Sequence, residues 1–105
     1  MAAINVNKEQ FNNLIHGEKP VLVDFWAPWC GYCRRIEMAY NKIADQYQEN
    51  LEVVKINIDE EPQLAEQERI EVIPTLVVYQ NGYDLGSVVA PDSKRSIEEF
   101  LKETL

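Results

Sequence analysis

Residues 21–33 of this 105-residue chain read VLVDFWAPWCGYC, and this stretch decides the fold. Its first six residues are almost continuously apolar, as is typical of a strand that is covered on both faces in a parallel sheet. After a short loop the chain reaches its only two cysteines, Cys30 and Cys33, and from there the apolar residues follow a helical period. Residues 21–33 therefore predict a buried strand that leads into a helix whose first turn carries both cysteines.

The rest of the chain extends this stretch into an α/β fold. Apolar residues at helical spacing predict a long amphipathic helix over about 31–49, and a second buried-type strand follows over 52–58. These segments form a strand–helix–strand unit, for which we expect parallel strands and a right-handed crossover. Periodicity and turn signals add a short strand at 5–7, a helix at 8–16, a helix at 62–69, a strand at 75–80, an antiparallel return strand at 85–89 and a last helix capped by Asp92 or Ser93. Because no repeat or linker interrupts the chain, residues 1–105 are expected to form a single domain.

The composition excludes several classes of protein. With 46% apolar residues the chain can bury a core, and its formal net charge of -8 disfavours binding to nucleic-acid backbones and anionic membranes. No apolar run approaches the roughly 20 residues that span a bilayer, and the first residues lack the features of a signal peptide. We therefore expect a cytoplasmic protein that binds neither nucleic acid nor membrane.

The spacing of Cys30 and Cys33 suits a disulfide that opens and closes. On a helix, residues three apart have Cα atoms about 5 Å apart, which lies within the range that a disulfide needs. The bond would close a very short loop and stabilise the fold little, while the N–H groups and dipole of the helix N-terminus favour a thiolate at Cys30. A zinc site within the chain would need both cysteines, His16 and a carboxylate, which is an unusual ligand set. The residues therefore favour redox chemistry over a metal site or plain core cysteines.

Four landmarks together make the whole chain resemble the thioredoxin family. Residues 23–33 resemble the family's active-site segment, 55–59 its third strand, 73–75 its cis-proline loop and 81–82 its hairpin turn. The resemblance implies the thioredoxin fold, an α/β fold in which a central mixed sheet of about five strands is flanked by about four helices. It also implies a thiol–disulfide oxidoreductase that uses no metal and no tightly bound cofactor.

The resemblance also implies roles for individual residues. Cys30 is the attacking thiolate and Cys33 the resolving thiol. Asp24 is the buried acid that exchanges a proton with Cys33, and Lys55 lies near that acid. The docking surface for protein substrates comprises Trp29, Gly31, Tyr32, Ile73, cis-Pro74, Thr75 and Val89. The residues alone leave plainer alternatives open, with Asp24 at a sheet edge, Lys55 on the surface and a trans peptide bond before Pro74.

Three positions depart from the family's usual pattern. Tyr32 replaces a proline, and the N–H group that it restores near Cys30 is predicted to stabilise the thiolate and make the couple more oxidising than that of ordinary thioredoxin. Met38 stands where many relatives have a kinking proline, so we expect a straighter helix. Residues 88–90, Val-Val-Ala, stand where Val-Gly-Ala is usual, and the missing glycine is expected to narrow the docking groove.

The implied partners are proteins with disulfide bonds and a thioredoxin-reductase-like flavin enzyme that uses NADPH, and we expect the chain to be a monomer. Three alternatives stay open. Tyr32 supports a disulfide isomerase or oxidant; the cysteine pair is also suited to hold an iron–sulfur cluster or copper between two subunits; and the fold alone could serve a structural role. The acidic run at 59–61 is expected to be a solvated loop that leads into a helix.

Overall fold

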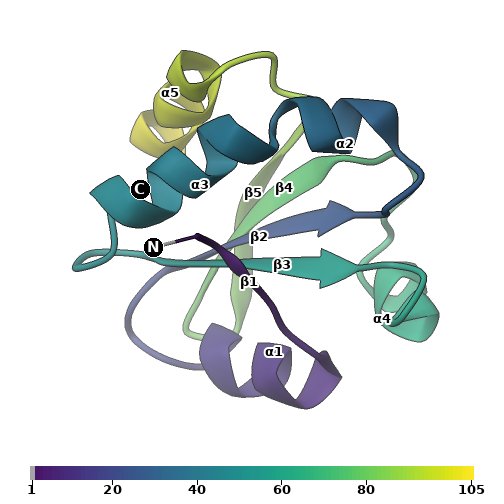
Figure 1. Cartoon of the computed structure of the whole chain (residues 1–105). Helices are drawn as coiled ribbons and strands as arrows, with labels where there is room; N and C mark the ends of the chain where they lie inside the picture. Colours follow the sequence, from purple (N-terminus) through teal and green to yellow (C-terminus); the bar gives the residue numbers. More distant parts are fainter. Residues whose placement is uncertain (1) are drawn as a thin grey trace.

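The computed structural model describes residues 2–105. Within this range the chain forms a five-stranded sheet and five helices (Figure 1). In chain order these elements are β1 (Ile4–Asn5), α1 (Lys8–Ile15), β2 (Val21–Trp26), α2 (Gly31–Arg35), α3 (Glu37–Gln46), β3 (Glu52–Asn57), α4 (Pro62–Gln67), β4 (Thr75–Gln80), β5 (Tyr83–Val89) and α5 (Lys94–Thr104). All the predicted strands are confirmed, with small shifts at their ends, and the cap of α5 is Ser93 rather than Asp92.

Strand β2 lies at the centre of the sheet, whose strand order is β1-β3-β2-β4-β5. β1 and β2 both pair with β3 in parallel, whereas β4 pairs with β2 and with β5 in antiparallel fashion. The predicted mixed sheet and its parallel strand–helix–strand unit are therefore confirmed. Because β2 has a neighbouring strand on each side and helices on both faces, its near-continuous apolar sequence is buried.

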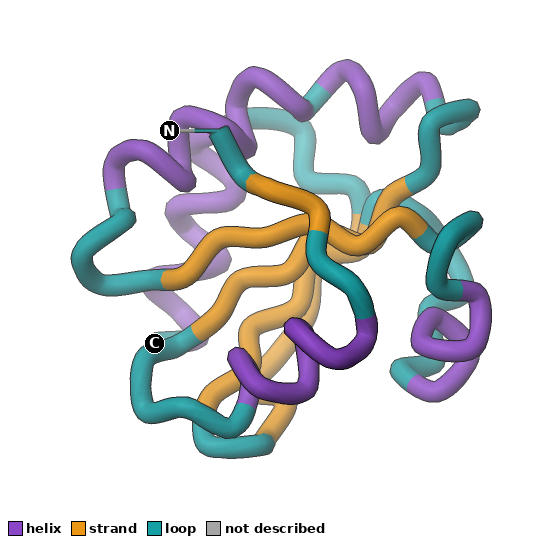
Figure 2. Tube along the Cα trace, turned by 60° about the horizontal axis from the view of Figure 1, so that its bottom comes forward, coloured by secondary structure: helices purple, strands orange, loops and turns teal. Residues whose placement is uncertain are grey.

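Helices cover both faces of the sheet and create two cores (Figures 1 and 2). α3 and α5 lie over one face, and α1 and α4 lie over the other. Side chains along β2 alternate between these cores: Leu22 belongs to the core under α3 and α5, whereas Val21 and Val23 belong to the core under α1 and α4. Asp24 follows the alternation of Leu22, so its carboxyl group lies on the α3 face of the sheet.

The helix predicted over 31–49 is in fact two helices, α2 and α3, which meet at Ile36. Ile36 has φ -89° and ψ -1°, at the edge of the right-handed helical region and away from the typical helical values of about -63° and -42°. Its side chain is nevertheless buried in the same core as Tyr40, so the apolar spacing continues across the interruption and gives no sign of it. The single uninterrupted helix expected over 31–49 is therefore wrong, and the interruption lies two residues before Met38. The split brings the helices within residues 2–105 to five, which agrees with the expectation of about four.

Candidate active site

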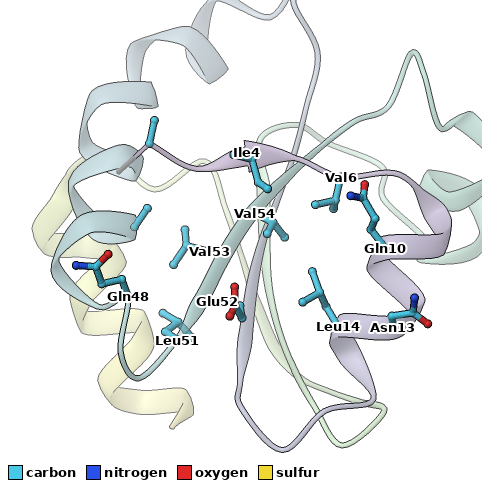
Figure 3. Close-up of a pocket in the computed structure, with 12 residues that line it drawn as sticks. Ile4, Val6, Gln10, Asn13, Leu14, Gln48, Leu51, Glu52, Val53 and Val54 are labelled. Atoms are coloured by element: carbon cyan, nitrogen blue, oxygen red, sulfur yellow. The ribbon is translucent and has the colours of Figure 1, made fainter.

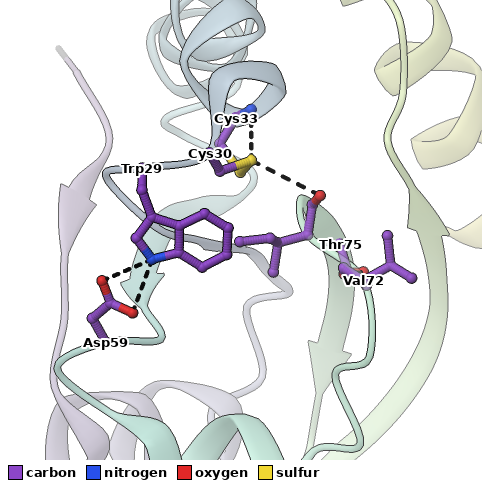
Figure 4. The surroundings of a disulfide bond; sticks show 7 residues. Trp29, Cys30, Cys33, Asp59, Val72 and Thr75 are labelled. Carbon is purple, nitrogen blue, oxygen red and sulfur yellow. Dashed lines mark hydrogen bonds between the residues drawn. A yellow bond between two sulfur atoms is a disulfide. The ribbon is translucent and has the colours of Figure 1, made fainter.

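The loop at 27–29 carries the chain from the end of β2 to Cys30, which caps the N-terminus of α2. Cys30 has an extended backbone, with φ -84° and ψ 107°, and its Sγ accepts a hydrogen bond of 3.1 Å from the N–H of Cys33 (Figure 4). A disulfide joins the two cysteines, and their Cα atoms are 5.3 Å apart. Both are buried, Cys33 more deeply. The predicted placement of the pair in the first turn of a helix is confirmed.

The loop before β4 faces the disulfide. The Ile73–Pro74 peptide bond is cis, as predicted, and the alternative of a trans bond is wrong. The carbonyl oxygen of Ile73 lies 3.9 Å from Cys30 Sγ, and the Ile73 side chain packs against the small apolar cluster that holds both cysteines. Thr75 is buried at the start of β4, where its hydroxyl donates a hydrogen bond to the carbonyl of Val72. The backbone of this loop is thus close enough to the disulfide to contact anything that approaches it.

Trp29 is the large exposed side chain beside the disulfide. It is 67% exposed, and its indole N–H donates to both carboxylate oxygens of Asp59, at 3.0 and 3.2 Å (Figure 4). Asp59 was expected only as part of a solvated loop, because no local pattern predicts a contact 30 residues away. Val89, at the end of β5, is also exposed and pairs with Thr75 of β4. Trp29 and Val89 therefore offer apolar surface near the disulfide.

Tyr32 connects α2 to the segment that follows β5. Its hydroxyl donates to the carbonyl of Ala90 at 3.3 Å, and the guanidinium of Arg35 lies 5.6 Å from the centre of its ring. Ala90 has φ 48°, in the left-handed region that favours glycine. Gly31, before Tyr32, has open space around it. The expected effects on the redox couple and on the groove stay predictions.

Asp24 is buried inside β2 rather than placed at a sheet edge. The residue is 2% exposed, and its Oδ1 has no hydrogen-bond partner within residues 2–105. Burial raises the pKa of Asp24 from 3.8 to about 7, because the ionised form loses its hydration; the positive charge of Lys55 lowers the pKa, and the negative charge of Glu37 raises it further. The Asp24 carboxyl group can therefore gain or lose a proton near neutral pH.

Lys55 lies opposite Asp24 in the β2–β3 register and is also buried, so the alternative of a surface lysine is wrong. Its Nζ lies 3.7 Å from Oε1 of Glu37 and 4.6 Å from the centre of the Trp26 ring. Glu37 was not predicted as a site residue. It stands four residues after Cys33, and this spacing places two residues on one side of a helix. The spacing was the one sequence feature that could have pointed to Glu37 as a site residue.

Other candidate sites lie apart from the disulfide. A pocket of about 420 Å³ opens between β1, α1 and the start of β3 (Figure 3), and none of the predicted site residues lines it. His16 ends α1, and its ring lies beside Gly82 of the β4–β5 turn. Residues 2–105 contain no group of three or more His, Cys, Asp or Glu side chains arranged to hold a metal ion. In the same part of the chain, no helix is long and apolar enough to cross a membrane.

The chemistry that the cysteine pair supports is exchange between a dithiol and a disulfide. The pair closes at a Cα separation that disulfides prefer, and the N–H groups at the start of α2 stabilise the thiolate that remains when the bond opens. On this fold, with a cis-proline loop facing the pair, the protein is a thiol–disulfide oxidoreductase.

Comparisons with known proteins lead to the same class. The family model described as Thioredoxin matches residues 2–103. Thioredoxin 1 of Nostoc sp. is 41% identical over 105 residues, covering 99% of this chain and 98% of the relative. The thioredoxin of Alicyclobacillus acidocaldarius is 35% identical over 104 residues, covering 99% of each chain. The solved structure of Malassezia sympodialis thioredoxin has a TM-score of 0.89 and 30% identity, covering 98% of this chain and 90% of its own.

The chain therefore belongs to the thioredoxin family. Members of this family reduce protein disulfides and are themselves reduced by reductases.

Proposed function

We propose that the protein works as a monomeric, cytoplasmic, single-domain electron carrier that reduces disulfide bonds in partner proteins and binds neither nucleic acid nor membrane. The position of Cys30 is the observation that best supports this function. Its sulfur caps α2 and accepts the N–H of Cys33 at 3.1 Å, so negative charge is stabilised on this atom. Cys30 is accordingly the attacking residue and Cys33 the resolving residue.

The reaction proceeds in two exchanges. The Cys30 thiolate attacks one sulfur of the partner's disulfide, forms a mixed disulfide and releases the other partner sulfur as a thiolate. Cys33 then gives its proton to the Asp24 carboxylate, and its thiolate attacks Cys30 Sγ. The mixed disulfide breaks, and its electron pair leaves with the partner's sulfur. The partner gains two electrons, and Cys30 and Cys33 are left as the disulfide seen in the structure.

Asp24 and Lys55 support the second exchange. A buried carboxyl group whose pKa is about 7 is well matched to accept a proton at neutral pH. The positive charge of Lys55, opposite Asp24 in the register, stabilises the ionised carboxylate before the transfer.

Substrates dock on the surface around the disulfide, where an extended segment of the partner contacts the cis-proline loop. The residues assigned to this surface are Trp29, Gly31, Tyr32, Ile73, Pro74, Thr75 and Val89. A flavin enzyme that uses NADPH, of the thioredoxin-reductase type, returns the Cys30–Cys33 disulfide to the dithiol. This cycle serves electron transport and redox homeostasis in the cell.

The direction of the reaction is tested by insulin reduction coupled to thioredoxin reductase and NADPH. We expect turnover by the wild-type protein and none by Cys30→Ser. Activity only as an oxidant or isomerase, without reductase-dependent turnover, would contradict the proposal. Iron or copper retained after anaerobic purification would instead support a metal-binding module.

The roles of the two cysteines are tested by trapping. Cys33→Ser should capture partner proteins on Cys30 as stable mixed disulfides, because the resolving thiol is missing. Capture by Cys30→Ser instead would reverse the assignment.

A further inference from the structure

The ion pair between Lys55 and Glu37 brings a third charged group to the buried carboxyl of Asp24. Asp24 and Lys55 are register partners on β2 and β3. Glu37 is the first residue of α3, directly after the interruption at Ile36, and its Oε1 lies 3.7 Å from Lys55 Nζ. The sheet thus contributes Asp24 and Lys55, and helix α3 adds the carboxylate of Glu37 as a third charged group.

The ammonium group of Lys55 is held on two sides. Its side chain is 11% exposed, and its Nζ lies between the Glu37 carboxylate and the Trp26 ring, whose centre is 4.6 Å away. Within residues 2–105, Lys55 forms its ion pair with Glu37 and not with Asp24, whose Oδ1 has no hydrogen-bond partner. The half-exposed Glu37 therefore fixes the position of the Lys55 ammonium, the positive charge that lowers the pKa of Asp24.

This arrangement suits a carboxyl group that must change its charge during a reaction. If Lys55 depended on Asp24 alone, protonation of Asp24 would leave a nearly buried ammonium group without a counter-charge, which is costly. With Glu37 present, Lys55 and Glu37 remain a neutral pair when Asp24 is protonated. Asp24 can then be either protonated or ionised near neutral pH. Without Glu37, the attraction of Lys55 would lower the pKa of Asp24 and keep it ionised.

We propose that Glu37 is a positioning residue for the proton transfer from Cys33 to Asp24: it holds the Lys55 ammonium in an ion pair and so keeps Asp24 able to accept a proton near neutral pH. The inference rests on the proposed function, because it concerns the second exchange of that reaction.

The other groups that face Asp24 do not replace Glu37. Tyr40 of α3 is fully buried and donates its hydroxyl to the carbonyls of Leu22 and Val54, and burial raises its pKa well above the ordinary value, so it stays neutral. On the β4 side the register partner is Leu76, which is apolar. Within residues 2–105, Lys55 and Glu37 are the charged groups that act on the pKa of Asp24.

The first test is an NMR titration of the Asp24 carboxyl carbon in the reduced protein. Glu37→Gln removes the repulsion and frees Lys55 to interact with Asp24. The Asp24 midpoint is therefore expected to fall by roughly half a pH unit to one pH unit. Glu103→Gln is the matched control, since it removes the same charge from an exposed residue near the C-terminal end of α5. Equal midpoints in Glu37→Gln and Glu103→Gln would overturn the proposal.

The second test follows single-turnover reduction of saturating insulin by the reduced protein across pH. The rate profile of Glu37→Gln should move to lower pH together with the NMR midpoint. In an Asp24→Asn background, Glu37→Gln should cause no further change. A change that persists in that background would show that Glu37 acts through another group and would also overturn the proposal.

The two proposals fail in different ways. Insulin reduction by Cys30→Ser would contradict the proposed function. The NMR midpoint of Asp24 tests the role of Glu37 without any turnover. Wild-type turnover combined with an unmoved Asp24 midpoint removes only the inference about Glu37.

Discussion

At the scale of single residues, Asp24 is proposed to accept a proton in the reaction, and its burial lowers the free energy of unfolding when the carboxyl group is ionised. A carboxyl group that is 2% exposed and has an unpartnered oxygen loses its hydration on folding, and the folded protein therefore prefers its protonated form. The pKa of about 7 lies above the ordinary value of 3.8. Proton uptake by Asp24 accordingly stabilises the fold fully below pH 3.8, and this stabilisation is lost as the pH rises through 7.

Asp24→Asn is expected to stabilise the protein more at pH 8.5 than at pH 5, where folded wild-type Asp24 still binds its proton. The difference arises because the asparagine side chain cannot ionise, whereas wild-type Asp24 must either bind a proton or bury a charge. The linkage limits the gain at high pH to about 4 kcal/mol. Urea unfolding of the wild-type protein and of Asp24→Asn at the two pH values measures this gain. A gain that is the same at both pH values would show that burial of the charge is not its cause.

Tyr32→Pro tests the residue that departs from the family in the active-site segment. Proline removes the Tyr32 N–H, which is predicted to stabilise the Cys30 thiolate, so the variant should be more reducing by about 30 mV or more. Equilibration with a glutathione redox buffer measures the potential.

Tyr32→Phe is the matched control for this substitution. It keeps the N–H and removes only the hydroxyl that donates to Ala90, so its potential should stay at the wild-type value. If Tyr32→Phe shifts the potential as much as Tyr32→Pro does, the hydroxyl contact is responsible rather than the N–H.

At the scale of elements, periodicity predicted which segments are helices and strands but not where a helix is interrupted. Ile36 keeps its inward side chain at the break between α2 and α3, so the apolar pattern of 31–49 is the same with or without the break. Glu37, the ion-pair partner of buried Lys55, was missed for a related reason. Register pairs such as Asp24 and Lys55 follow from strand order, whereas the contact of Glu37 depends on how α3 lies on the sheet.

Met38→Pro is expected to be tolerated because Met38 is the second residue of α3. N–H groups in the first turn of a helix have no partner within that helix, and the Met38 side chain is 73% exposed. The free energy of unfolding should change by about 1 kcal/mol or less. Lys42→Pro, at a position in the middle of α3, should lose about 3 kcal/mol or more. Urea unfolding compares the two variants. Equal losses in the free energy of unfolding would contradict a new helix start after Ile36.

At the scale of the whole molecule, the fold and the disulfide depend on different parts of the chain. The sheet is stabilised by two cores, one under α3 and α5 and one under α1 and α4, and the disulfide lies in a third, small cluster at one end of β2. The fold was predictable from sequence because the alternating and helical patterns that build the two cores are regular. The electrostatics of the site were not, since they arise from side chains that three elements bring together.

The reduced protein should therefore remain folded. The disulfide joins residues separated by 3 positions, and a loop this short removes little entropy from the unfolded chain, so its contribution is about 2 kcal/mol. Thermal unfolding with and without dithiothreitol should give a single transition in both cases, with a modest fall in Tm on reduction. A variant with both Cys30→Ser and Cys33→Ser should match the reduced protein and not respond to dithiothreitol. Loss of the folded state on reduction would show that the bond supports the fold, and a bond with that task cannot be opened once per catalytic cycle.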